Sequence, residues 1–260
     1  MKRITSRDNA AFKALKKLAQ SGRERRQSRR IVLDGMHLIE GYRERFGLPD
    51  EILVSEIGLR RAEIARFVET HPELAIVALT DTLFSELATV DTPSGIMAVA
   101  NLPSNERILD PMADAVLLDG IQDPGNLGSI LRSAAAAGFR QVLLSFDCAQ
   151  AWSPKTLRAA MGAHFQLDLL ENHDLIESLS TYRGESIVTA LDTADDLFST
   201  RLDATVAWIF GSEGQGVRPA LAARAKRRVC IPMPGGAESL NVGAAAAVCL
   251  FETVRQRRLS

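Results

Sequence analysis

The feature that most restricts the fold of this chain is one pattern that occurs three times in its C-terminal half. Apolar runs at 116–118, 206–210 and 229–231 are each followed by a glycine-bearing loop and then by helical sequence. Unbroken apolar strands that alternate with helices are typical of a parallel sheet covered on both faces. Ligands of open α/β sheets bind at the carboxyl ends of the strands. We therefore expect the three loops to form a single site.

The third of these loops, at 230–243, has the composition of a small-molecule site. Its prolines cannot continue a sheet ladder, and Gly235 and Gly236 permit a tight turn. Ser239 and Asn241 stand where the next helix begins, and their side chains can cap its free N–H groups. The loop therefore offers backbone donors and acceptors with little side-chain bulk.

The alternation of strands and helices extends along the chain and predicts two α/β domains. The first spans 1–105, a linker with little apolar periodicity spans 106–113, and the second spans 114–260. The second domain is predicted to be a doubly wound sheet, which by itself does not define a chemistry. The expected strands are 31–33, 52–54, 74–79 and 96–100 in the first domain, and 115–118, 141–145, 166–169, 187–190, 206–210 and 228–231 in the second.

Composition argues against several classes of protein. No apolar run approaches the ~20 residues of a membrane span, and the N-terminus lacks a signal-peptide pattern. Cys148, Cys230 and Cys249 are widely spaced, which favours a reducing compartment over a disulfide framework. The four histidines show no metal-ligand spacing. We therefore expect a cytoplasmic protein with neither a membrane segment nor a metal.

The net charge of −1 conceals an asymmetry. Residues 1–30 carry eleven Lys/Arg against two acidic residues, whereas the remainder carries 20 basic and 30 acidic residues. A basic arm on an acidic protein indicates a polyanionic partner, although a solvated tail or an amphipathic transit peptide would also fit. The basic run has no aromatic residues, which favours phosphate contact without base reading. The candidate nucleic-acid-binding residues are Lys13, Lys16, Lys17, Arg23, Arg25, Arg26, Arg29 and Arg30, with Lys155 and Arg158 from a later helix, for which ordinary solvated charges are the alternative.

The glycine loops also invite comparison with dinucleotide sites. Gly211, Gly214 and Gly216 have the spacing G-x-x-G-x-G, whereas a pyrophosphate at a helix start requires G-x-G-x-x-G. The chain contains no Gly-Lys-Ser/Thr sequence of the P-loop kind. A nicotinamide-dependent dehydrogenase is therefore a distant alternative.

The helix expected at 127–137 carries one basic residue of interest. Its apolar positions form a single stripe, and Arg132 projects from the opposite face about two turns after the first loop. An arginine in this position is often only a solvated helix residue. The ligand-type loop before it and the small residues around it favour a functional role.

The three segments together resemble the ordered motifs of SpoU (TrmH-type) RNA ribose methyltransferases. The motifs are DPGNLG at 123–128 with Arg132, GSEGQG at 211–216, and IPM at 231–233 followed by ESLNV at 238–242. The resemblance covers about 114–256. The N-terminal part is similar to the SpoU substrate-binding domain, whose fold is related to ribosomal RNA-binding proteins. The sequence departs from the family at Asp34, where Glu is common, and at the Gly235-Gly236 insertion.

This resemblance implies a trefoil-knotted parallel α/β methyltransferase domain, one of the exceptions to unthreaded topology. It also implies S-adenosylmethionine as cofactor and a homodimer formed through the knotted domain. The substrate would be a ribose 2′-hydroxyl in RNA, with ribosomal RNA favoured because a large structured RNA needs contacts beyond the catalytic pocket. Transfer RNA is an alternative substrate, and a non-catalytic RNA-binding or ribosome-assembly protein that retains the knot is an alternative function. The cofactor-binding residues implied are Leu191, Gly211, Gly216, Ile231, Met233, Ser239 and Leu240.

The resemblance also implies roles for five catalytic residues. A ribose hydroxyl is a poor nucleophile, so Arg132 would contact the target phosphate or hydroxyl and stabilise the oxygen as its proton leaves. Asn126 would orient Arg132 or the sugar, and Asn241 would fix Ser239 and the cofactor side. Glu213 would shape its loop or take part in catalysis directly. Ser239 completes the predicted set.

Overall fold

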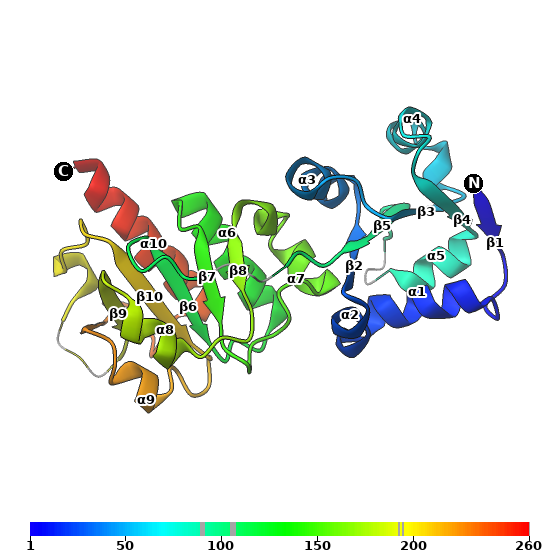
Figure 1. Cartoon of the computed structure of the whole chain (residues 1–260). Helices are drawn as coiled ribbons and strands as arrows, with labels where there is room; N and C mark the ends of the chain where they lie inside the picture. The colour runs from blue at the N-terminus through cyan, green and yellow to red at the C-terminus, as the bar shows by residue number, and fades with distance from the viewer. Residues whose placement is uncertain (89–91, 105–107, 192, 194, 260) are drawn as a thin grey trace. The chain divides into compact units, whose positions relative to one another are not determined.

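The computed structural model describes residues 1–88, 92–104, 108–191, 193 and 195–259. The chain forms two compact units. The first contains Met1–Pro103 together with Trp152–Phe165, and the second contains Ser104–Ala151 together with Gln166–Ser260. Each unit is described by itself below, with the elements labelled as in Figure 1.

The first unit is built on a five-stranded mixed sheet in the order β1-β4-β3-β5-β2. The pairs β1–β4 and β3–β4 are parallel, whereas β5 runs antiparallel to β3 and β2. Helices α1 and α5 bury their apolar stripes on one face of this sheet. The strands are β1 (Lys2–Ile4), β2 (Arg30–Asp34), β3 (Glu51–Ser55), β4 (Ala75–Leu79) and β5 (Ile96–Asn101), and the helices are α1 (Ala10–Gln20), α2 (Gly22–Ser28), α3 (Met36–Phe46), η1 (Gly58–Arg60), α4 (Ala62–Thr70), α5 (Asp81–Leu87) and α7 (Pro154–Ala159).

Helix α7 belongs to the first unit although it follows the linker in sequence. It packs on β2, and Trp152 and Leu157 are buried in this unit. The ring of Trp152 meets Phe46 of α3 edge-on, with centroids 6.4 Å apart, and the carbonyl of Met161 contacts the ring of His37 at 3.0 Å. Residues 152–165 are therefore an integral part of the N-terminal core.

The second unit is a six-stranded sheet in the order β11-β9-β10-β6-β7-β8, and every pairing in it is parallel. Alternate strand residues pack on α8 and α9 on one face, and Trp208 reaches α10 on the other. The predicted α/β fold with a parallel, doubly covered sheet is thereby confirmed. The strands are β6 (Ala115–Asp119), β7 (Gln141–Leu144), β8 (Asp168–Leu170), β9 (Glu185–Thr189), β10 (Val206–Gly211) and β11 (Arg227–Val229), and the helices are α6 (Pro124–Ala137), α8 (Leu175–Thr181), η3 (Leu197–Ser199), α9 (Pro219–Ala222) and α10 (Val242–Leu259), with η2 (Ala163–Gln166) where the chain re-enters this unit.

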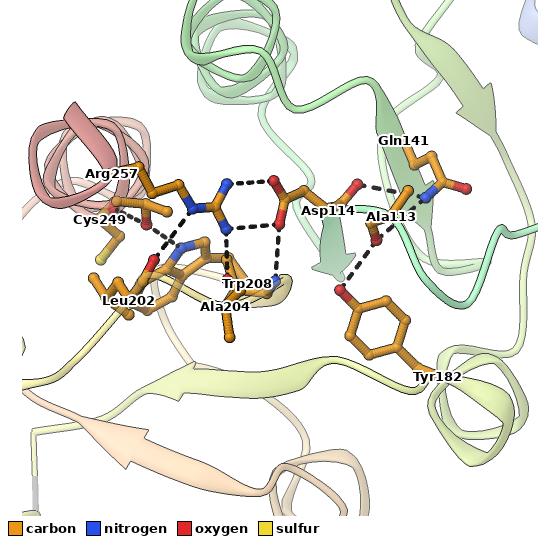
Figure 2. Close-up of polar contacts among 11 residues, drawn as sticks. Ala113, Asp114, Gln141, Tyr182, Leu202, Ala204, Trp208, Cys249 and Arg257 are labelled. Carbon is orange, nitrogen blue, oxygen red and sulfur yellow. Dashed lines mark hydrogen bonds and ion pairs between the residues drawn. The ribbon is translucent and has the colours of Figure 1, made fainter. Parts of the chain in front are cut away.

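The C-terminal helix is fixed to the amino edge of this sheet by a polar network (Figure 2). The guanidinium of Arg257 donates two hydrogen bonds to the carboxylate of Asp114, at 2.5 and 2.9 Å. Asp114 also accepts from the backbone N–H of Val206, and the hydroxyl of Tyr182 donates to the carbonyl of Ala113. Burial, followed by the nearby charge of Asp114, raises the pKa of Tyr182, so its hydroxyl remains a donor at neutral pH. This network anchors the last turns of α10.

The other end of α10 lies at the carboxyl edge, against α6. A Cβ atom added at Gly243 would lie 3.2 Å from Cβ of Ser129, so the absence of a side chain there permits the close approach of the two helices. Trp208 of β10 donates from Nε1 to the hydroxyl of Thr253 at 3.0 Å, which ties the middle of α10 to the sheet. The helix is therefore held along its length, and its first turn has a fixed position relative to the strand ends.

Candidate functional site

The three glycine-bearing loops leave the sheet of the second unit at its carboxyl edge. The register of β6 and β10 pairs Asp119 with Gly211, so the first and second loops start side by side. β11 pairs with β9, which pairs with β10, and the third loop therefore starts two strands away. That loop leads into α10, which packs on α6. The geometry thus brings the three loops to one region, where the strand order also changes direction.

A chain of three polar side chains joins the loops. Nδ2 of Asn241, from the third loop, donates to Oδ1 of Asn126 at 2.9 Å. Nδ2 of Asn126, in the first turn of α6, donates to Oε1 of Glu213 in the second loop. Each loop contributes one residue, although the partners are 115 and 87 positions apart in sequence.

Backbone groups fix the direction of these hydrogen bonds. Oδ1 of Asn241 accepts from the N–H of Gly243 at 2.9 Å, so its NH2 group must face Asn126. Asn126 then presents its oxygen to Asn241 and its NH2 group to Glu213, which accepts as a carboxylate. The side chain of Asp123 in turn caps the N–H of Asn126 at 2.8 Å. The cluster is therefore preorganised, with the Glu213 carboxylate at its end.

A cavity of about 460 Å³, within the usual range for small-molecule sites, opens beside this cluster. Backbone groups and apolar side chains form most of its wall, and among the described residues that line it the charged ones are Glu213 and Arg228. The residues that the sequence assigned to a cofactor all line this cavity: Leu191, Gly211, Gly216, Ile231, Met233, Ser239 and Leu240.

The second loop is a tight turn whose shape depends on Gly211. A Cβ atom added at Gly211 would lie 2.0 Å from the carbonyl carbon of Gly216, a distance that backbone atoms cannot tolerate. Gly216 has φ +67° and donates its N–H to the carbonyl of Ser212 at 2.8 Å, and the hydroxyl of Ser212 accepts from the N–H of Gln215. The loop therefore folds back on the strand from which it emerges and presents Glu213 to the cavity.

Two of the five predicted catalytic residues lie outside the hydrogen-bonded chain. Ser239 lines the cavity on the third loop and is exposed. Arg132 is exposed on α6, two turns beyond Asn126, and forms no ion pair within the described residues. Its side chain is thus available to a ligand outside the cavity.

An ion pair that the sequence analysis did not identify holds the second loop to β6. The carboxylate of Asp119, only 2% exposed, accepts from Nε of Arg218 and from its backbone N–H, both at 2.8 Å. An acidic residue directly after the apolar run at 116–118 was the available signal, because such a carboxylate must find a partner when the strand is buried. The pair fixes the C-terminal end of the loop.

Replacing Arg218 with alanine is expected to lower the free energy of unfolding by about 2 kcal/mol at neutral pH, because the Asp119 carboxylate stays buried without its partner. Arg218 is half exposed, which keeps the expected loss below that of a fully buried pair. Urea unfolding measures the change. Arg201→Ala, which breaks the exposed pair with Asp203, is the control and should change stability little. Equal losses in the two variants would contradict the assigned role of Arg218.

The predicted RNA-binding residues lie in the first unit, and one is placed differently from the expectation. Arg25 is 7% exposed and donates to the carbonyls of Leu18 and Ala19, both at 3.0 Å, at the end of α1. This placement corrects the expectation for Arg25, whose guanidinium caps a helix instead of facing solvent. Arg158 is half-buried, and its charge acts on partly buried Asp34, whose pKa is raised mainly by desolvation. Exposed members of the predicted set are Lys13, Lys17, Arg23, Arg26, Arg29 and Lys155, whereas Lys16 and Arg30 are partly buried.

Comparison with known proteins assigns the chain to a family. Residues 114–251 match the SpoU rRNA Methylase family, and residues 9–98 match the MRM3-like substrate binding domain. The chain belongs to the SpoU rRNA methylase family. The resemblance inferred from the three motifs is thereby confirmed.

Three relatives of this SpoU chain match it over nearly its whole length. The 23S rRNA (guanosine(2553)-2′-O)-methyltransferase RlmP of Bacillus subtilis is 33% identical over 253 residues, which cover 96% of this chain and 98% of RlmP. A crystal structure of an RNA 2′-O ribose methyltransferase superposes with a TM-score of 0.84 at 32% identity, covering 98% and 99% of the two chains. The SpoU methyltransferase AviRb of Streptomyces viridochromogenes, in complex with AdoMet, gives 0.86 at 25% identity, covering 96% and 98%.

The described residues contain no group of three or more His, Cys, Asp or Glu side chains placed to hold a metal ion. In the same part of the chain, no helix combines the length and the apolar character that crossing a bilayer requires.

Proposed function

We propose that this SpoU protein transfers a methyl group from S-adenosylmethionine to a ribose 2′-hydroxyl of ribosomal RNA. The observation that carries the proposal is the preorganised chain Asn241–Asn126–Glu213 at the rim of the cavity. The reaction and the RNA class follow from RlmP, a full-length relative that is named as a 23S rRNA 2′-O-methyltransferase. In the proposed division of labour, 1–105 binds RNA, 106–113 is a linker and 114–260 carries the site.

The cavity fits the proposed methyl donor in size and lining. Its volume of about 460 Å³ suits a nucleoside with an amino-acid tail. Leu240, Ile231 and Met233 offer apolar surface for a flat base, and the backbone beside Gly211 and Leu191 offers hydrogen-bonding groups for the ribose and the tail. Bound there, S-adenosylmethionine supplies an electrophilic methyl group on a positively charged sulfur. The cavity wall carries the charges of both Glu213 and Arg228, so a ligand that has positive and negative groups is favoured electrostatically.

Arg132 is the residue proposed to act on the RNA. Its guanidinium is exposed on α6, where it can bind the target phosphate and stabilise the hydroxyl oxygen as the hydroxyl proton passes to solvent water and the oxygen takes the methyl group. Asn126 orients the sugar, and its hydrogen bonds with Glu213 and Asn241 keep the Asn126 side chain in place. Ser239, on the cavity wall, is placed to contact the cofactor side of the reacting atoms. Positioning of the two reactants and electrostatic stabilisation together are sufficient in principle for such a transfer.

We further propose that the second unit forms a trefoil knot, that it dimerises through α10, and that the protein acts in the cytoplasm. The family resemblance supports the knot. Phe251 on α10 is 48% exposed, and Ala244 and Ala247 on the same helix are small and not buried, which permits close packing with a second copy. An oligomer measurement by light scattering tests the dimer, and a monomer at micromolar concentration would contradict it.

The decisive experiment compares methyl transfer to several RNAs. Purified protein, tritiated S-adenosylmethionine and in vitro transcripts of 23S ribosomal RNA and of transfer RNA are combined, and the modified nucleotide is mapped by its resistance to alkaline cleavage. Transfer to the ribosomal transcript at a single ribose is the expected result. Transfer to the tRNA alone would show that transfer RNA, and not ribosomal RNA, is the substrate. Cofactor binding by calorimetry without transfer to any RNA would favour a non-catalytic role, and no cofactor binding would contradict the proposal.

A further inference from the structure

The eleven basic residues of the N-terminal arm are not equivalent in the folded first unit. Six of them lie within ion-pair distance of a carboxylate of the same unit, one is buried, Lys2 is exposed on the edge strand β1, and three at α2 project into solvent. This difference determines which of them can bind a polyanion without first losing a partner.

The lysine face of α1 is neutralised locally. Lys13 pairs with Asp8 at 2.9 Å, Lys16 with Glu86 at 2.8 Å, and Lys17 with Glu24 at 3.4 Å. Each pair is partly exposed and therefore weak, but the adjacent carboxylate repels a phosphate that approaches the same lysine. Three arginines are paired in the same way: Arg3 with Glu56, Arg7 with Glu86, and Arg30 with Asp50.

Helix α2 is held rigidly against α1 by the buried Arg25. Its guanidinium bonds to the C-terminal carbonyls of α1, and the side chain of Ser21 caps the N–H of Glu24. At the other end, Arg29 adopts a left-handed conformation, φ 52° and ψ 38°, and its carbonyl accepts from the N–H of Leu102 at 2.8 Å. The position of α2 in the unit is thus fixed at both ends.

Three arginines, the α2 ridge, lie on this helix and at its C-terminal cap: Arg23, Arg26 and Arg29. All three are exposed, and within the described residues none forms an ion pair. Arg23 and Arg26 lie one turn apart, about 4.5 Å along the axis, and Arg29 follows at the C-terminal end. The carboxylate closest in sequence, Glu24, is already paired with Lys17. The ridge therefore concentrates three uncompensated positive charges on a rigid support.

We propose that the α2 ridge is the surface of the first unit that contacts RNA phosphates, and that the lysine face of α1 contributes little. The proposal rests on the proposed function, since it takes RNA as the partner. Guanidinium groups bind phosphate through two parallel hydrogen bonds, and a fixed helix loses little freedom when it does so. The ridge carries no aromatic residue, so it positions the RNA backbone without reading its bases.

The experiment compares two variants that lose the same three charges. One is Arg23→Gln with Arg26→Gln and Arg29→Gln, and the other is Lys13→Gln with Lys16→Gln and Lys17→Gln. Affinity for an in vitro 23S ribosomal RNA transcript is measured by filter binding from 50 to 300 mM KCl. The ridge variant is expected to reduce the slope of log affinity against log salt by about 2, because each lost phosphate contact removes roughly 0.7–0.9. The α1 variant is expected to change the slope by less than about 0.5.

The outcomes separate this inference from the proposed function. Equal slope changes in both variants, or a larger change in the α1 variant, would contradict the proposal that the α2 ridge contacts the RNA phosphates. If the wild-type protein binds RNA but transfers no methyl group, the proposed methyl transfer is contradicted. The comparison of RNA affinities then still tests the α2 ridge. Absence of RNA binding by the wild type would overturn both. Because Arg29 occupies a strained cap position, the double variant Arg23→Gln with Arg26→Gln is included, with an expected slope change of about 1.5 and an unchanged melting temperature.

Discussion

Arg132→Ala is expected to lower the rate of methyl transfer to RNA by about 10²–10³-fold while leaving S-adenosylmethionine affinity within twofold of the wild type. The two effects separate because Arg132 is exposed on α6 and is absent from the described lining of the cavity. A loss of this size corresponds to removing one pre-placed charge from the site of a developing oxyanion, about 3–4 kcal/mol. Single-turnover transfer of a tritiated methyl group measures the rate, and calorimetry measures the affinity.

A matched control for Arg132 is Arg140→Ala, which removes an exposed arginine shortly after the end of α6. Arg140→Ala should retain the full rate of methyl transfer, because we expect the slow transfer of Arg132→Ala to come from loss of that particular guanidinium and not from a general loss of positive charge. Arg132→Lys should recover only part of the rate, since an ammonium group cannot form the paired hydrogen bonds of a guanidinium. Transfer by Arg132→Ala at the wild-type rate would remove this residue from the mechanism.

The second large effect is expected from Gly211→Ala. The new Cβ atom would lie 2.0 Å from the carbonyl carbon of Gly216 and 2.1 Å from the nitrogen of Val217, and neither backbone atom can move without shifting the loop. Because this loop forms one wall of the cavity, S-adenosylmethionine affinity is expected to fall by at least about 100-fold, near 2.7 kcal/mol. Calorimetry measures the affinity, and a thermal melt shows whether the domain stays folded.

Gly235→Ala is the control for Gly211→Ala. A Cβ atom at Gly235 meets no atom within 4 Å, and the residue lies in the third loop without lining the cavity. Its affinity and melting temperature should match those of the wild type. If Gly211→Ala binds the cofactor as tightly as this control, the cavity is not the cofactor site.

The sequence predicts the parallel sheet well because its strands are buried on both faces. All six residues of β10, including Trp208 and Phe210, are buried, and an unbroken apolar run is the direct signature of such a strand. The three-residue strand β1 was not predicted. Lys2 and Arg3 are exposed, and a strand this short at a sheet edge leaves no periodic pattern.

The candidate site could be predicted only in part from the sequence. The motifs marked Asn126, Glu213 and Asn241, but their contact spans 87 and 115 residues and depends on strand order, which local patterns do not encode. Arg25 was misplaced for a similar reason. Within a basic run, one arginine that turns inward to cap a helix has the same sequence signature as its solvated neighbours. Which of the predicted residues catalyse remains a prediction.

The placement of α7 restricts how proteins of this kind can be recombined. Because residues 152–165 come from the middle of the segment that matches the methylase family and yet pack in the first unit, the polypeptide passes between the units three times. A chimera that exchanges only the residues before the linker would leave Trp152 and Leu157 facing a foreign surface. Replacing the whole first unit therefore requires transplanting two separate stretches of sequence, 1–103 and 152–165.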